Sequence, residues 1–220
     1  MRRIDTPLRW RAYLGLARVA GATRRLPGSG QEIALTFDDG PDPESTPRVL
    51  DVLAAHDAVA TFFCVGQRAR RHPELVQRIV AEGHTVGSHS ETHRVEDLGA
   101  QAVVADYQAG RRSLEDVLGR PVPLFRPPHG WLDGSSAWAL RRLGFRTRLW
   151  TVDPHDYEPG TEAMDLRQGL NGCSAGDVVL LHDVLEEAPD GAPSRDVLVE
   201  ALPDAIAGIR ARGLDLVTLS

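Results

Sequence analysis

The feature that most constrains the fold is an alternation of short apolar segments with longer amphipathic ones, which begins near residue 31. The short segments are typical of buried strands and the longer ones of helices. Strands are expected at 33–37, 60–64, 84–88, 123–126, 146–152, 177–181 and 214–218, and helices at 46–56, 73–82, 99–118, 134–143, 162–171 and 196–212. Repeats of this kind form a parallel sheet covered by helices. About seven repeats favour a closed α/β barrel over an open doubly wound sheet, which stays the alternative.

Polar side chains gather where these predicted strands end. In both candidate architectures, ligands bind at the carboxyl ends of parallel strands. The residues that fall at such ends are Asp38, Asp39, His89, Arg126, Asp153 and His182. Their shared position predicts one functional site at that edge of the sheet.

The first strand ends in the sequence Thr-Phe-Asp-Asp-Gly-Pro at 36–41. Successive side chains of a strand point to opposite faces, so Asp38 and Asp39 can share a site only where the strand breaks into a turn. Gly40 and Pro41 supply that break. Neighbouring carboxylates repel each other unless a cation lies beside them or the two have different roles. We therefore expect one of the two to bind a metal ion and the other to act as a base.

A pair of histidines offers the remaining metal ligands. The sequence His-Ser-Glu-Thr-His at 89–93 spaces His89 and His93 four residues apart, which would place both imidazoles on one face of a helical turn. Two histidines and one carboxylate are a common ligand set of catalytic zinc and leave a position for water. Asp39 or Asp38 is the candidate third ligand. His84 lies where a turn enters a strand, and we interpret it as structural.

Three later segments add charged and aromatic groups. Arg126 ends a strand before a Pro-Pro turn, and its guanidinium can hold a carboxylate in one orientation. A backbone N–H of the following turn can serve a developing oxyanion. Asp153 and Tyr157 belong to an acidic loop after another strand. His182 ends a buried strand, with an Asp partner available, which suits a general acid.

The charge of the chain argues against nucleic acid as a partner. The formal net charge is −6. Residues 1–30 contain seven Arg and one acid, Asp5, which gives +6, so the remainder carries −12. Cys64 and Cys173 are the two cysteines, and their spacing indicates neither a disulfide framework nor a metal site.

Residues 1–30 are expected to form a basic N-terminal helical extension of the domain at 31–220. Arginines interrupt its apolar stretch, which is too short for a signal peptide, and no stretch of the chain approaches the length of a transmembrane helix. One helix face would carry Trp10, Tyr13, Leu14 and Ala17. We interpret this face as packed on the domain, with an interfacial helix over 8–22 on an anionic membrane as the alternative. These features favour a cytoplasmic or peripheral-membrane location, with the cell envelope as a further alternative.

Taken in order, the five segments closely resemble the polysaccharide deacetylase family, the NodB homology domain of carbohydrate esterase family 4. The resemblance spans residues 31–220, and its most specific motifs are those at 36–41 and 89–93. It implies a distorted (β/α) barrel. It also implies a metal-dependent hydrolase of linear amides that removes acetyl from an N-acetylated amino sugar in a glycan such as chitooligosaccharide or peptidoglycan, and releases acetate.

The resemblance further implies roles for individual residues. Asp38 would be the general base, and Arg126 would orient it. Asp39, His89 and His93 would hold a divalent metal, with zinc the expected ion.

The same resemblance makes His182 the general acid and Asp153 the carboxylate that tethers it. Leu180 would line the space for the acetyl methyl, and the backbone N–H at His129 would serve the oxyanion. Family members usually carry Tyr at the position of His129 and Trp at that of Tyr157. The resemblance therefore indicates the reaction more firmly than it indicates the substrate. A metal-dependent amidase for a small non-sugar amide and a non-catalytic carbohydrate-binding relative are the alternatives.

Overall fold

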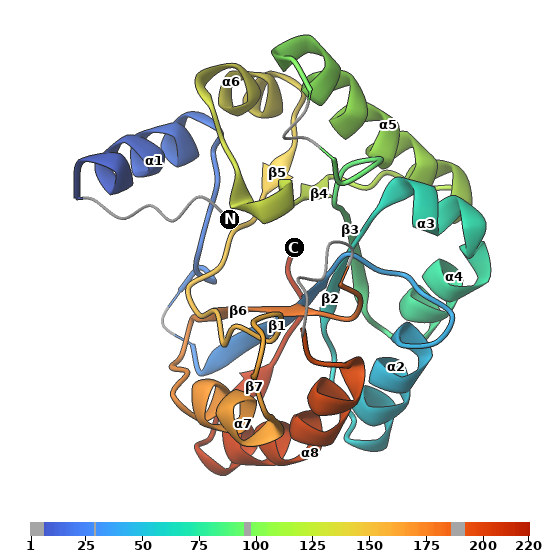
Figure 1. Ribbon diagram of the computed structural model, residues 1–220, viewed down its shortest axis with the longest axis vertical. Coiled ribbons are helices and arrows are strands. Elements are labelled where there is room, and N and C mark those ends of the chain that lie inside the picture. The colour runs from blue at the N-terminus through green and yellow to red at the C-terminus, as the bar shows by residue number, and fades with distance from the viewer. Residues whose placement is uncertain (1–6, 29, 95–97, 186–191) are drawn as a thin grey trace.

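A curled parallel sheet forms the centre of the molecule, with helices on its outside (Figure 1). The computed structural model describes residues 7–28, 30–94, 98–185 and 192–220. The sheet has seven strands in the order β5-β4-β3-β2-β1-β6, and β7 pairs with the beginning of β1. This arrangement confirms the predicted α/β fold with a distorted barrel of parallel strands.

The described elements follow the predicted alternation closely. The strands are β1 (Glu32–Asp38), β2 (Thr61–Cys64), β3 (Thr85–Ser88), β4 (Leu124–Phe125), β5 (Arg146–Thr147), β6 (Val178–His182) and β7 (Asp215–Leu216). The helices are α1 (Pro7–Val19), α2 (Thr46–Ala55), α3 (Gly66–Arg71), α4 (Pro73–Ala81), α5 (Ala100–Leu118), α6 (Gly134–Arg142), α7 (Ala163–Asn171) and α8 (Arg195–Ala211), with a short turn η1 (Pro128–Gly130).

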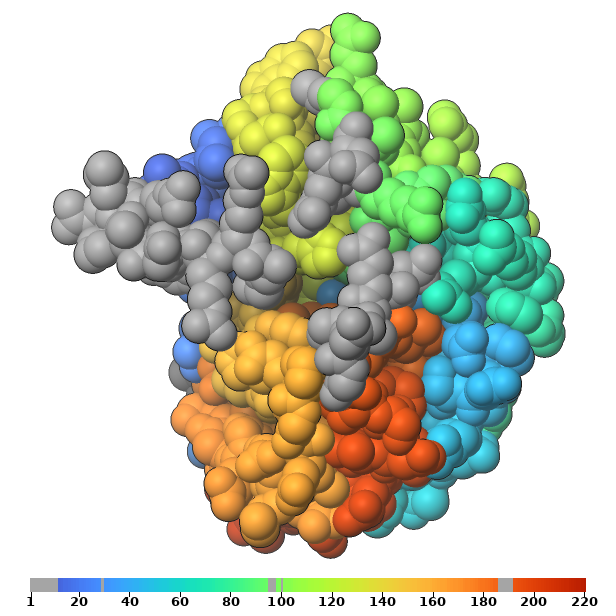
Figure 2. All heavy atoms as spheres, viewed as in Figure 1, coloured from blue at the N-terminus to red at the C-terminus, as the bar shows by residue number. Residues whose placement is uncertain are grey.

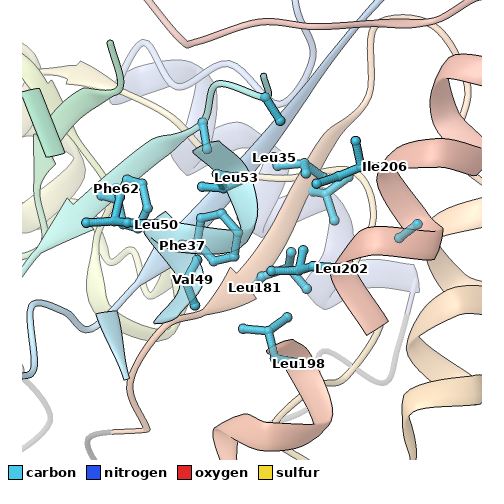
Figure 3. Close-up of a cluster of buried hydrophobic side chains, with 14 of the residues drawn as sticks. Leu35, Phe37, Val49, Leu50, Leu53, Phe62, Leu181, Leu198, Leu202 and Ile206 are labelled. Carbon is cyan, nitrogen blue, oxygen red and sulfur yellow. The ribbon is translucent and has the colours of Figure 1, made fainter. Parts of the chain in front are cut away.

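The main hydrophobic core lies between the sheet and the helices α2 and α8 (Figure 3). Leu35 and Phe37 of β1 point into it and are fully buried. Because side chains alternate along a strand, Thr36 and Asp38 face the opposite way, into the curled sheet. Strand β6 runs beside β1 in a register that pairs Asp38 with His182. Because Leu35 and Phe37 pack into the outer core, Thr36 and Asp38 are left to face the inside of the sheet.

Strands β4, β5 and β7 are much shorter than the sequence predicted. Strand β4 is flanked by Pro123 and Pro127, which have no N–H to donate to a neighbouring strand. Strand β5 ends at Thr147, because the next two carbonyl groups accept hydrogen bonds from the guanidinium of Arg126. Helix α3 was not predicted, since its six residues make fewer than two turns and only Gly66 and Ala69 of them are buried.

The N-terminal helix α1 packs against α6, as the blue and yellow atoms at the upper left of Figure 2 show. Ala17 is buried there, in a cluster that the half-buried Tyr13 joins. The chain then pairs with the end of β5 and the residues after it. Thr23 N–H donates to the carbonyl of Thr147 (3.1 Å), and Leu149 N–H donates to the carbonyl of Thr23 (2.8 Å). The side chain of Trp10 lies outside the described part of the structure. Within the described ranges, no helix is long and apolar enough to cross a bilayer.

Candidate functional site

Three buried side chains form a candidate metal site at the carboxyl edge of the sheet. One ligand atom from each of Asp39, His89 and His93 lies within 4.8 Å of the others. Asp39 Oδ1 is 3.4 Å from His89 Nε2 and 3.2 Å from His93 Nε2. Asp38 reaches the same region, with its Oδ2 3.7 Å from His89 Nε2. The structure thus brings both carboxylates to the histidines, as the sequence predicted.

The turn after β1 allows two adjacent carboxylates to face one site. Asp39 adopts a left-handed backbone conformation with φ 76°, which is uncommon for a residue other than glycine. The next residue, Gly40, lies against the buried carboxylate of Asp183. A Cβ at Gly40 would come within 2.2 Å of Asp183 Oδ2, so only glycine fits. This close approach explains why glycine follows the two carboxylates.

The loop that carries His89 and His93 corrects one expectation. The two residues do not lie on a helical turn; they are brought together by a bent loop in which Ser90 (φ 70°) and His93 (φ 63°) are left-handed. The Ser90 hydroxyl accepts a hydrogen bond from the N–H of His93 (2.9 Å). Helix α5 packs so closely here that a Cβ at Gly110 would lie 2.2 Å from the Ser90 carbonyl oxygen. A spacing of four residues suits a helix, but these contacts hold the segment in the conformation of a bent loop.

The surroundings of the two histidines suit metal binding. His89 Nδ1 lies 2.8 Å from the carbonyl oxygen of Arg126. A carbonyl can only accept, so Nδ1 donates a proton to it, and Nε2, on the side of Asp39, is the nitrogen available to a metal. Burial, helped by the charges of other histidines and opposed by Asp39, lowers the pKa of His93 to about 3. Two imidazole nitrogens and one carboxylate are a ligand set that fits a divalent metal.

Arg126 holds Asp38 from inside the curled sheet. Its fully buried guanidinium lies over the ring of Phe63, 4.2 Å from the centroid. Nη1 donates to Asp38 Oδ1 (2.7 Å) and to the hydroxyl of Thr36 (2.7 Å), and Nε donates to the carbonyl of Arg148 (3.2 Å). One oxygen of Asp38 is thereby fixed, and the other faces the histidines.

The partner of His182 is Asp156, and this corrects the prediction that Asp153 tethers it. His182 Nδ1 lies 2.8 Å from Asp156 Oδ1, and the N–H of His182 donates to Asp156 Oδ2 (2.9 Å). Arg195, the first residue of α8, donates through Nη1 to Asp156 Oδ2 (2.8 Å) and through Nη2 to the Asp156 carbonyl (2.7 Å). The general-acid candidate is therefore held by a fully buried carboxylate that is itself fixed by an arginine.

The charge around His182 favours its protonated form. Burial by itself would lower the pKa of the imidazole, but the charge and hydrogen bond of Asp156, with the charges of Asp39 and Asp38, raise it to about 9. A cationic imidazole at neutral pH has a proton to give, as a general acid requires.

Asp153 orients a different side chain. Its carboxylate accepts from the N–H of His155 (3.0 Å) and from the hydroxyl of Tyr157 (3.1 Å). The ring of Tyr157 stands edge-on to His182, with centroids 5.2 Å apart. His155 is left-handed with φ 58°, which turns the chain so that the acid three residues after Asp153 reaches the histidine. The sequence contained both acids, and only this local bend decides between them.

His129 and Leu180 also lie at the site. His129 sits in the turn after Arg126 with φ 55°, and its ring stands edge-on to His93, with centroids 4.7 Å apart. Leu180 is buried and shares the inner face of β6 with His182, since alternate residues face the same side. All the predicted site residues thus gather at one edge. Asp156 and Arg195 join them, although sequence reasoning gave neither a role.

Comparison with known proteins places this geometry in a family context. A family model described as polysaccharide deacetylase matches residues 25–148. A peptidoglycan-N-acetylglucosamine deacetylase of Bacillus cereus is 35% identical over 202 residues, which cover 90% of this chain and 91% of that protein. A chitooligosaccharide deacetylase of Azorhizobium caulinodans is 32% identical over 206 residues, covering 90% and 97%.

The fold is similar to that of solved structures as well. The crystal structure of the Bc1960 peptidoglycan N-acetylglucosamine deacetylase superimposes with a TM-score of 0.82 at 31% identity, and the match covers 94% of this chain and 95% of that one.

Metal binding is the first prediction. Zinc titrated into metal-free protein and followed by calorimetry should bind with one equivalent to the wild type. His89→Ala and His93→Ala should lose most of this affinity, because three protein ligands are typical of a catalytic zinc site. Asp38→Asn, in which the amide can still accept from Arg126, should retain it. Equal affinity in all four proteins would contradict the assigned ligand set.

Proposed function

Because the chain belongs to the polysaccharide deacetylase family, we propose that it hydrolyses the N-acetyl group of an N-acetylated amino sugar in a poly- or oligosaccharide. The names of its relatives support peptidoglycan or chitooligosaccharide as the class of substrate. The observation that carries the proposal is the meeting of three parts at one sheet edge. These are a buried carboxylate fixed by arginine, a set of three metal ligands, and a histidine kept protonated by its surroundings.

Asp38 is the proposed general base. Its Oδ1 is held by Arg126 at 2.7 Å, so the carboxylate is fixed in one orientation. Its Oδ2 lies 3.7 Å from His89 Nε2, on the side of the metal ligands. From this position the carboxylate takes a proton from the water that attacks the acetyl carbon.

Asp39, His89 and His93 are the proposed ligands of a divalent metal, and zinc is the ion we propose. When bound, it supplies Lewis-acid chemistry, which polarises the acetamide carbonyl and lowers the pKa of water from about 15.7 toward about 7. The backbone N–H of His129 is the proposed donor to the oxygen that becomes negative when the carbonyl is attacked.

His182 completes the reaction as the proposed general acid. It gives its proton to the sugar nitrogen as the C–N bond breaks, because an unprotonated amide anion is too basic to leave. The water oxygen stays on the acetyl carbon, so the products are acetate and a free amino sugar. Leu180 would lie beside the acetyl methyl, and Tyr157 beside the sugar.

The direct test is mass spectrometry of N-acetylglucosamine oligomers incubated with the enzyme. Each acetyl group removed should lower the mass by about 42 Da. Chelation should stop the reaction, and zinc should restore it. Unchanged masses at every metal content would contradict the proposal and favour a non-catalytic carbohydrate-binding relative. Cleavage of small acetamides alone would favour an amidase.

Removal of the base gives a second test. Asp38→Asn should lower turnover by roughly two to four orders of magnitude, the usual worth of general acid–base catalysis. Because Asp39, His89 and His93 remain, the metal content of the same preparation should stay that of the wild type. Loss of the metal together with activity would show that Asp38 is a ligand.

The pH profile tests the general acid. The active form of His182 is protonated, so activity is present below its pKa and falls as the pH rises through it. Asp156 is the strongest influence that raises this pKa, to about 9. Asp156→Asn should therefore move the alkaline limb of kcat to lower pH. Asp153→Asn serves as the matched control and should move the limb less, and a larger shift in the control would restore Asp153 as the partner.

A further inference from the structure

The N-terminal helix reaches the turn that follows Arg126. The hydroxyl of Tyr13 donates to the carbonyl of Gly130 at 3.0 Å, across 117 residues of sequence. Tyr13 lies in α1 on the face that packs against the domain. Burial, partly opposed by two arginines, raises the pKa of Tyr13 to about 12, so the hydroxyl keeps its proton throughout the neutral range.

The turn that receives this hydrogen bond has an unusual backbone. Gly130 N–H donates to Pro127 (2.9 Å), and the N–H of Trp131 donates to Pro128 (2.9 Å). His129 and Gly130 are both left-handed, with φ of 55° and 64°. A left-handed backbone is unfavourable for a residue other than glycine, so surrounding contacts must hold His129 in it.

Gly130 is confined from two sides. A Cβ at this position would lie 2.7 Å from the ring of Trp150 and 3.4 Å from the hydroxyl of Tyr13. The N-terminal segment is itself fixed to the same region, because Arg24 Nε donates to the carbonyl of Trp150 at 3.0 Å. The helix and the segment after it therefore form one wall of the turn.

We propose that Tyr13 is a positioning residue for the deacetylation. Its hydroxyl holds the Gly130 carbonyl and so keeps the left-handed turn at His129 and Gly130 in place. This turn in its place directs the N–H of His129 toward the reacting carbonyl oxygen. This inference rests on the proposed function. It gives the basic N-terminal helix a part in the site that its sequence did not indicate.

Tyr13→Phe tests this role, since it removes one hydroxyl and keeps the ring. The oxyanion develops only in the transition state, so the loss should appear in kcat while KM changes by less than about twofold. The loss of one hydrogen bond of ordinary strength should lower kcat by roughly fivefold to tenfold.

Tyr107→Phe is the matched control. Tyr107 is buried in the same cluster as Ala17, and its hydroxyl has no hydrogen-bond partner among the described residues. This variant should retain the kcat of the wild type. An equal loss in both variants, or an unchanged kcat in Tyr13→Phe, would overturn the proposal.

Hydrogen exchange provides a readout that does not need activity. A peptide that covers residues 126–132 should exchange faster in Tyr13→Phe than in the wild type, whereas Tyr107→Phe should leave its exchange unchanged. Unaltered exchange in Tyr13→Phe would overturn the positioning role. If the wild type released no acetate but the exchange still differed, the proposed function would fail while the contact was confirmed.

Discussion

The site depends on a guanidinium buried inside the curled sheet. Arg126 is fully buried, and a charge in such a position is tolerated only when it is paired and hydrogen-bonded. Its side chain binds Asp38 and Thr36 of β1 and the carbonyl of Arg148 after β5. Its backbone carbonyl accepts from His89. One residue therefore ties the base, a metal ligand and two parts of the sheet together.

A second group of charged residues lies beside the first. It is a chain of hydrogen bonds in which Arg195 fixes the carboxylate of Asp156, and this carboxylate holds His182. Asp183 follows His182 and is buried beside Gly40. Burial and the charges of Asp39 and Asp38 raise its pKa to about 7, although a hydrogen bond from Thr46 opposes this. The base and the acid thus have different environments, which is how two titrating groups come to have opposite roles.

Much of this arrangement could be predicted from the sequence, because strand alternation and strand ends are local properties. The carboxylates at the end of β1, the histidine pair and His182 were all expected at the edge where they lie. The partner of His182 was not, because it depends on the left-handed backbone of His155. The contact of Tyr13 with Gly130 joins residues 117 apart, and no local pattern reports such a contact.

The central claim is that the Arg126 side chain serves the base and its backbone serves the metal site. Zinc content and kcat measured on one preparation of Arg126→Lys test it most directly. Lysine keeps the charge but lacks the planar fork that reaches both Asp38 and Thr36. We expect zinc content equal to that of the wild type and a kcat lower by roughly one to two orders of magnitude, the worth of a hydrogen bond to a charged group. An unchanged kcat, or loss of zinc together with activity, would contradict the account.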